Sequence, residues 1–293
     1  MKYIIDTDPG IDDAIAICLG YLNKLDIIGF TIATGNVSLE NTENNLKVIQ
    51  SVLDSKIEMY RPAILNNSTM YADFAHGKDG LGDINIPRVN MEINTKAAED
   101  FIIEAANKYQ DDLTIICLAP LTNLANAIKK DSSFVNKVHE VVIMGGSYDE
   151  NETVRYKEFN LKIDAESTNL VLNSNFKKIK LVTHEVGVNS YIPLEDILSF
   201  KNSKDVITNF IYLVSQKYIE FTIERNGLIG LSNPDPSTIA SIIDSSITTF
   251  KPCTVKKEED DFIFTLTDKS NIEVSVDTNV NKFRKLFINT LKR

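Results

Sequence analysis

Short apolar runs alternate along the chain with longer stretches in which apolar residues recur every three or four positions. The runs have the length and composition of buried strands, and the longer stretches have the period of amphipathic helices. Strands are predicted at Tyr3–Asp6, Ile27–Ala33, Leu113–Leu118, Glu140–Met144 and Ile179–Thr183. Helices are predicted near Asp12–Leu22, Leu39–Leu53, Thr95–Lys108, Leu121–Lys129 and Ala165–Asn173. This alternation predicts an α/β fold with an open, mostly parallel sheet flanked by helices.

The pattern changes toward the carboxyl end of the chain. A long helix is predicted at Asp205–Arg225 and a final helix at Asn279–Leu291. Between them, Thr249–Val255, Asp261–Thr267 and Asn271–Val276 alternate apolar and polar side chains, as antiparallel strands with one solvated face do. We therefore expect a small C-terminal antiparallel extension, built as a meander. No linker-like stretch divides the chain, so residues 1–293 are expected to form one domain.

The composition narrows the classes of function. With 43% hydrophobic and 25% charged residues, the chain is typical of a soluble globule with a substantial core. A formal net charge of −10 argues against nucleic acid or an anionic membrane as a partner. Cys18, Cys117 and Cys253 form no CxxC pair, which argues against a zinc ribbon. Without a signal peptide after Met1 or a bilayer-length apolar run, we expect a cytoplasmic protein with no membrane partner.

Four aspartates lie within eight residues directly after the apolar run Tyr3-Ile4-Ile5, namely Asp6, Asp8, Asp12 and Asp13. Ionised carboxylates this close repel one another and usually need a cation or a shared proton. A turn, or a helix cap at Asp12 or Asp13, explains one or two of them but not four. Oxygen ligands with no histidine nearby indicate Ca²⁺ or Mg²⁺ rather than zinc.

Other polar loops follow the predicted strands. They read IATGN (32–36), HGKDGLG (76–82), LAPLTN (118–123), MGGS (144–147), EFNLKID (158–164) and NPDPST (233–238). Singly, each is ordinary turn or cap chemistry, with Pro236 placed at a first helical position. Because open α/β sheets bind ligands at the carboxyl ends of their strands, we expect these loops to converge with the aspartates on one edge.

In this order, DTDPGIDD, TGN, HGxxGLG, PLTN, MGG, EFN and DP resemble the motifs of the nucleoside hydrolases, the inosine–uridine-preferring nucleoside N-ribohydrolases, over roughly residues 2–241. The resemblance implies an open α/β sheet in one domain, assembled as a homodimer or homotetramer. It also implies a ribonucleoside substrate and Ca²⁺-dependent hydrolysis of the N-glycosidic bond, which gives ribose and a free base.

The resemblance assigns roles by position. Asp8 would be the general base and a metal ligand. Asp13, Asp235 and the main-chain carbonyl of Leu118 would complete the calcium site, and Asp6 would support the loop. The ribose would contact Asp12, Asn36, Met144, Glu158 and Asn160.

The base-binding side departs from the family pattern. Many members have a histidine directly before the aspartate that matches Asp235, and it helps the nucleobase leave. That position is Pro234 here, which cannot donate a proton, and a frequent tyrosine near the end of the long helix is Asn226. A ribose-contacting asparagine in the loop after MGG falls on Glu152, with Asn151 beside it.

His76 is the best candidate for protonating the leaving base, because its loop should lie near the base, and we assign it a catalytic role. A loop histidine bonded to the backbone is an equally open interpretation. His184 could reach the pocket from a strand end, although a structural role is more common there. Tyr148, Tyr156 and Tyr218 could stack on a base.

Three functions are compatible with these residues. The first is a Ca²⁺-dependent ribonucleoside hydrolase. The second, which Pro234 and Asn226 motivate, is a catalytically weak or inactive nucleoside- or ribose-binding protein on the same fold. The third is another metal-dependent hydrolase, such as a phosphoesterase, although no phosphate-cradling loop accompanies the acidic one.

Overall fold

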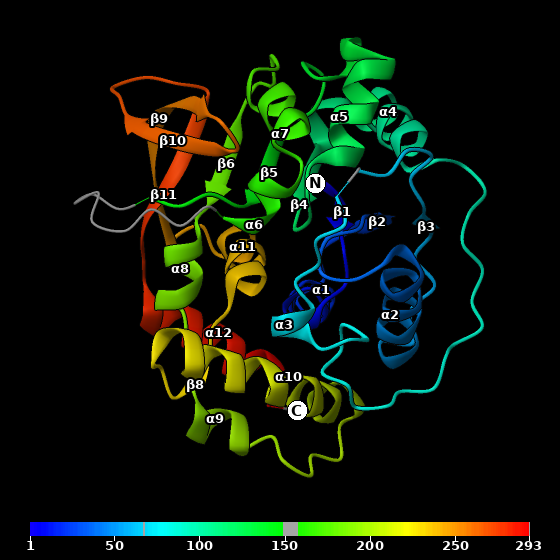
Figure 1. Cartoon of the computed structure of the whole chain (residues 1–293), viewed down its shortest axis with the longest axis vertical. Helices are drawn as coiled ribbons and strands as arrows, with labels where there is room; N and C mark the ends of the chain where they lie inside the picture. Colours follow the sequence, from blue (N-terminus) through cyan, green and yellow to red (C-terminus); the bar gives the residue numbers. More distant parts are fainter. Residues whose placement is uncertain (67, 149–157, 293) are drawn as a thin grey trace.

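The computed structural model describes residues 1–66, 68–148 and 158–292. Within them, nine strands form one sheet in the spatial order β10-β9-β11-β6-β5-β4-β1-β2-β3 (Figure 1). Neighbours from β11 to β3 run parallel, which confirms the open, mostly parallel sheet. The strands are β1 (Lys2–Thr7), β2 (Ile27–Ile32), β3 (Met59–Tyr60), β4 (Leu113–Cys117), β5 (Glu140–Met144), β6 (Ile179–Val182), β9 (Thr248–Glu258), β10 (Asp261–Leu266) and β11 (Ile272–Thr278).

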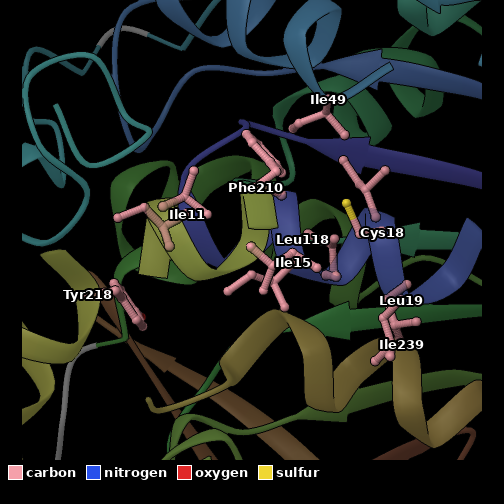
Figure 2. Close-up of a cluster of buried hydrophobic side chains, with 14 of the residues drawn as sticks. Ile11, Ile15, Cys18, Leu19, Ile49, Leu118, Phe210, Tyr218 and Ile239 are labelled. Atoms are coloured by element: carbon pink, nitrogen blue, oxygen red, sulfur yellow. The ribbon is translucent and has the colours of Figure 1, made fainter. Parts of the chain in front are cut away.

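Helices cover both faces of the sheet, because successive side chains of a strand point to opposite sides. Ile5 of β1 packs with one set of helices and Ile4 with the other. The first set is α1 (Ile11–Leu22), α2 (Leu39–Val52), α10 (Val206–Asn226), α11 (Pro234–Ile243) and α12 (Val280–Leu291). The second set is α4 (Ala98–Tyr109), α5 (Thr122–Lys130) and α7 (Ala165–Leu172). Figure 2 shows the core around α1, where Leu19 lies near Ile239 of α11.

Several short elements connect the long ones. They are α3 (Asp73–His76), α6 (Phe159–Ile163), α8 (His184–Asn189), α9 (Leu194–Leu198), a β7 (Ile192–Pro193) and β8 (Gly230–Leu231) pair, and two 3₁₀ turns at Gln110–Asp112 and Ser132–Phe134. None of the helices in the described part of the chain combines the length and apolar character that crossing a bilayer requires.

The strand order reverses direction at β1, and this reversal places the site. β1 pairs with β2 on one side and with β4 on the other, so the connections that leave the carboxyl ends of β1 and β4 run away from each other. A crevice forms where connections diverge in this way. The aspartate loop, which follows β1 directly, lies at this crevice.

The C-terminal extension is antiparallel, as expected, but it is not a meander. β9 lies between β10 and β11, and β11 continues the main sheet parallel to β6. The buried Val274 pairs with Leu181, so burial beside β6 determines the place of this strand.

Two predicted helix starts are wrong by a few residues. The N-cap of α1 is Gly10, not Asp12 or Asp13. Asp13 instead accepts the Gly10 N–H from one turn inside the helix, at 3.0 Å. α11 begins at Pro234, which takes the first helical position that was expected for Pro236.

Candidate active site

A cavity of about 250 Å³ lies at the carboxyl ends of the parallel strands. All five residues predicted to bind ribose line it, together with His76, Leu118 and Asp235 from the predicted catalytic and metal residues. The sequence did not single out several other lining residues, namely Ala72, Phe74, Ala75, Phe159 and Phe221. Loops far apart in the sequence therefore meet here, as the strand-end argument predicts.

Asp12, Asp13 and Asp235 form the centre of the site. Each offers a carboxylate oxygen within 4.8 Å of the other two. Burial raises the pKa of Asp12 and of Asp13 to about 6, and it raises the pKa of Asp8 and of Asp235 well above the usual range. Repulsion between neighbouring carboxylates adds to this rise at Asp8, Asp13 and Asp235. The cluster therefore favours protons or a cation among its oxygens.

Asp8 is fully buried, and its two oxygens differ. Oδ2 accepts the backbone N–H of Asn36 at 2.7 Å, whereas Oδ1 is buried with no hydrogen-bond partner among the described residues. The close approach depends on Gly35, because a Cβ there would lie 2.2 Å from Asp8 Oδ2. A buried acceptor without a donor is costly unless water, a proton or an ion meets it.

Asp13 is held by three donors. Its Oδ1 accepts the Thr7 hydroxyl at 2.5 Å, and its Oδ2 accepts the Asn36 amide at 2.9 Å and the Gly10 N–H. These bonds fix the carboxylate relative to both β1 and the loop after β2.

Asp12 also has a donor for each oxygen. Oδ1 accepts the backbone N–H of Asp13 at 3.2 Å, and Oδ2 accepts the Tyr218 hydroxyl at 3.4 Å. The second bond links α1 to α10 across the cavity wall.

Asp6 lies outside the cavity lining and ties the sheet to its neighbours. Its Oδ1 accepts the Thr31 hydroxyl at 2.6 Å and the Asn123 amide at 2.8 Å. Burial raises its pKa to about 7. These bonds join β1 to β2 and α5 directly below the aspartate loop.

Glu158 and Asn160 are fixed by the start of α6. The Glu158 carboxylate caps the helix by accepting the N–H groups of Asn160 and Leu161 at 2.9 and 3.0 Å, and it also accepts that of Gly146. Burial raises the pKa of Glu158 to about 7. The Asn160 amide donates to the Leu118 carbonyl at 2.8 Å, which leaves this oxygen its second lone pair.

His76 lines the cavity, as a residue that acts on the base would, and it is also bonded to the backbone, as a structural loop histidine would be. Its Nδ1 accepts the Ile11 N–H at 3.1 Å. Burial lowers the pKa of His76 to about 4, so the ring is neutral at pH 7 and carries its hydrogen on Nε2. Such a ring donates a hydrogen bond from Nε2 but is a weak acid for protonating a leaving group.

A row of aromatic rings runs along one wall. The ring centroids are 5.2 Å apart for His76 and Tyr218, 5.6 Å for Tyr218 and Phe221, and 5.7 Å for Phe221 and Phe74. Phe74 is 65% exposed, so the row leads from Asp12 to the protein surface. We define these four side chains as the aromatic row. Its spacing suits the face of a nucleobase or another flat ring.

Three of the other residues considered for the base-binding side line the cavity. Pro234 lines it, as do His184 from the start of α8 and Arg225 from the last turn of α10. Asn226 and Tyr148 are not among the lining residues. The predicted contacts of Asn151, Glu152 and Tyr156 lie outside the described residues.

Comparison with known sequences identifies related proteins. A family profile described as inosine-uridine preferring nucleoside hydrolase matches residues 3–285. Uridine nucleosidase 1 of Arabidopsis thaliana is 32% identical over 263 residues, which cover 88% of this chain and 78% of that protein. Inosine-uridine preferring nucleoside hydrolase of Crithidia fasciculata is 26% identical over 314 residues, with 100% and 98% covered.

Solved structures share the fold. A plant nucleoside hydrolase, PpNRh1, superposes with a TM-score of 0.88 at 24% identity, over 99% of this chain and 98% of that one. A purine-preferring ribonucleoside hydrolase from Gardnerella vaginalis gives the same TM-score at 23% identity and the same coverage. At these identities the superpositions establish the architecture only.

Proposed function

The chain belongs to the inosine-uridine preferring nucleoside hydrolase family, and we propose that it hydrolyses the N-glycosidic bond of ribonucleosides with a Ca²⁺ ion held by its aspartates. The family assignment supports ribonucleoside hydrolysis. One observation supports the metal, namely that buried carboxylates gather at the cavity with an unpartnered oxygen on Asp8.

The donor set fits a hard divalent cation. Carboxylate and carbonyl oxygens are the ligands that Ca²⁺ prefers. We assign Asp8, Asp13, Asp235 and the Leu118 carbonyl as ligands. Both oxygens of Asp12 already accept protein donors, whereas Asp8 Oδ1 accepts none from the part of the chain that the structure describes, so we assign Asp12 to a ribose hydroxyl rather than to the metal. A bound Ca²⁺ would lower the pKa of a water molecule and orient it.

We assign Asp8 as the general base. Asn36 holds its Oδ2, which orients the carboxylate and leaves Oδ1 to accept the proton of the attacking water. The expected reaction builds positive charge on the ribose as the C–N bond breaks, as glycoside hydrolysis does. The carboxylates of Asp12 and Glu158 in the cavity wall favour that charge in their ionised form.

The ribose contacts are held in place before substrate arrives. Asn36 donates to Asp8 and Asp13, Asn160 donates to the Leu118 carbonyl, and three backbone N–H groups fix Glu158. Met144 adds an apolar contact beside Asn160. Because these groups need little reorganisation, they can recognise each hydroxyl of a bound ribose.

A reducing-sugar assay over a panel of ribonucleosides tests the proposal. We expect release of free ribose in Ca²⁺, loss of release in excess EGTA, and recovery on adding Ca²⁺ back. Asp8→Asn should lower kcat by about 10³-fold or more, since general-base loss and metal loss act together. The matched control is Asp268→Asn, a change at an exposed residue, which should keep full activity.

The second candidate function gives the opposite result. A nucleoside-binding protein without turnover would bind nucleoside in equilibrium dialysis and release no ribose with Ca²⁺ present. Pro234, which has no proton to donate at the first position of α11, is the observation that favours it. Ribose release from no member of the panel would reject the hydrolase.

A further inference from the structure

The cavity-facing side of α10 carries three residues in a helical row. Tyr218, Phe221 and Arg225 are spaced three and four positions apart, so they lie on one face of the helix, and all three line the cavity. Tyr218 bonds to Asp12 at the carboxylate end, and Arg225 is one turn beyond Phe221, in the last turn of the helix. Among the described lining residues, Arg225 is the only one with a permanent positive charge.

A second element brings His184 to the same place. α8 and the start of α11 meet in backbone contact, because a Cβ on Gly187 would lie 2.5 Å from the Pro234 Cα and the Asn233 N–H donates to the Gly187 carbonyl at 3.0 Å. His184 precedes Gly187 by three residues and shares its helix face. It therefore reaches the cavity beside Pro234.

The charge of Arg225 affects the pKa of His184. Burial lowers the pKa of His184 first, Glu185 raises it, and the Arg225 guanidinium lowers it further. Glu185 accepts the Ser147 hydroxyl and the Tyr148 N–H, so its carboxylate is engaged with the loop after β5. A neutral imidazole thus lies near a guanidinium at the cavity wall.

Bond cleavage places an electron pair on the base nitrogen. Pro234 has no proton to deliver, and the His76 ring is not an imidazolium, since its Nδ1 accepts the Ile11 N–H. We propose that Arg225, positioned by His184, stabilises the negative charge of the departing nucleobase, so that the base leaves as an anion. This inference rests on the proposed function, and it identifies the group that acts on the leaving base.

The step balances without a general acid. The C1′–N bond breaks and its electron pair stays on the base nitrogen, while the water oxygen bonds to C1′ and the water proton passes to Asp8. The anionic base then leaves beside Arg225 and takes a proton from solvent. Guanidinium groups suit this role because their charge is permanent and their N–H donors form a planar fork.

The test compares two leaving groups in the intact protein. Uridine releases a base that needs charge stabilisation, whereas p-nitrophenyl β-D-ribofuranoside releases an anion that its own nitro group stabilises. Arg225→Gln should lower kcat for uridine on the order of 100-fold. It should change kcat for the aryl riboside by less than about threefold, because the same ribose contacts are used.

Two further variants test charge and positioning. Arg225→Lys should recover most of the uridine kcat if positive charge is what matters. His184→Ala should lower kcat for uridine and not for the aryl riboside. Adding it to Arg225→Gln should cause little further loss, since the imidazole acts through the guanidinium.

A matched control and the opposing outcomes complete the design. Arg88→Gln removes an exposed arginine that pairs with Glu40, and it should leave both substrates unaffected. Equal losses on uridine and the aryl riboside in Arg225→Gln would overturn the inference and leave the proposed function standing. Absence of turnover of both substrates by the unsubstituted protein would overturn the proposed function and this inference with it.

Discussion

Gly35 sets the position of Asp8, and replacing it gives a sharp prediction. A Cβ at residue 35 would lie 2.2 Å from Asp8 Oδ2 and 3.0 Å from two Pro120 ring carbons. An ordinary carbon–oxygen contact is about 3.3 Å, so Gly35→Ala demands a shift of about 1 Å. The proline ring blocks the other direction, so the carboxylate must move and its bond to the Asn36 N–H must lengthen.

The expected size of the effect follows from that displacement. A misplacement of about 1 Å at a reacting group can cost about 100-fold in rate. Overpacking a buried site costs roughly 1–3 kcal/mol of stability. We therefore expect Gly35→Ala to lower kcat for ribose release about 100-fold while the protein still folds.

The assay is steady-state ribose release, with thermal unfolding measured on the same samples. Gly20→Ala in α1 is the matched control, because its Cβ would lie 3.3 Å from the flexible end of Leu25 and at ordinary contact distance, 3.6 Å, from Ile239. Near-normal kcat in a folded Gly35→Ala protein would refute the argument that this glycine positions the base.

Three further predictions concern the cation, the sugar and pH. Chelation should lower the unfolding temperature by roughly 5 °C, because Ca²⁺ at a hundredfold excess over its Kd contributes about 2.7 kcal/mol to the free energy of unfolding. Calorimetry with and without EGTA measures the shift, and an unchanged unfolding temperature would count against the calcium site. 2′-Deoxyuridine should be hydrolysed at least about 10³-fold less efficiently than uridine in kcat/KM, since groups built to bind a hydroxyl are left unpaired without it; comparable values would reject the assigned ribose contacts. Burial raises the pKa of Glu158 to about 7 from 4.5, so between these values the folded state holds a proton that the unfolded state lacks. The contribution of Glu158 to the free energy of unfolding therefore falls as pH rises through that window. Urea titrations at several pH values should show that Glu158→Gln removes this dependence of the free energy of unfolding on pH; the same pH dependence in both proteins would contradict the prediction.

The sequence predicted the parts of this protein that follow from local pattern. Strands β1, β2, β4, β5 and β6 and the flanking long helices were visible in apolar periodicity, whereas the two-residue β3 was not predicted. The strand-end rule brought Asp235 to the aspartate loop from the far end of the chain. The family and its fold are confirmed. The roles of the individual site residues are still predictions.

What the sequence did not predict depends on tertiary contacts. β11 pairs with β6 because Val274 is buried there, and no local pattern distinguishes that pairing from a meander. Phe74 and Phe221 are exposed or half-buried aromatic residues, which carry no periodic signal. The closest clues were their spacings, two residues before His76 and three after Tyr218.

The carboxylate cluster joins residues separated by more than two hundred positions of chain, since Asp13 is near one end and Asp235 is near the other. During synthesis from the amino terminus, the aspartate loop exists long before its partner has been made. The loop's carboxylates stay without Asp235 until α11 emerges and packs on α1. We therefore expect the proposed cation, which needs carboxylates from both ends, to bind only a nearly finished chain and so to separate completed molecules from truncated ones.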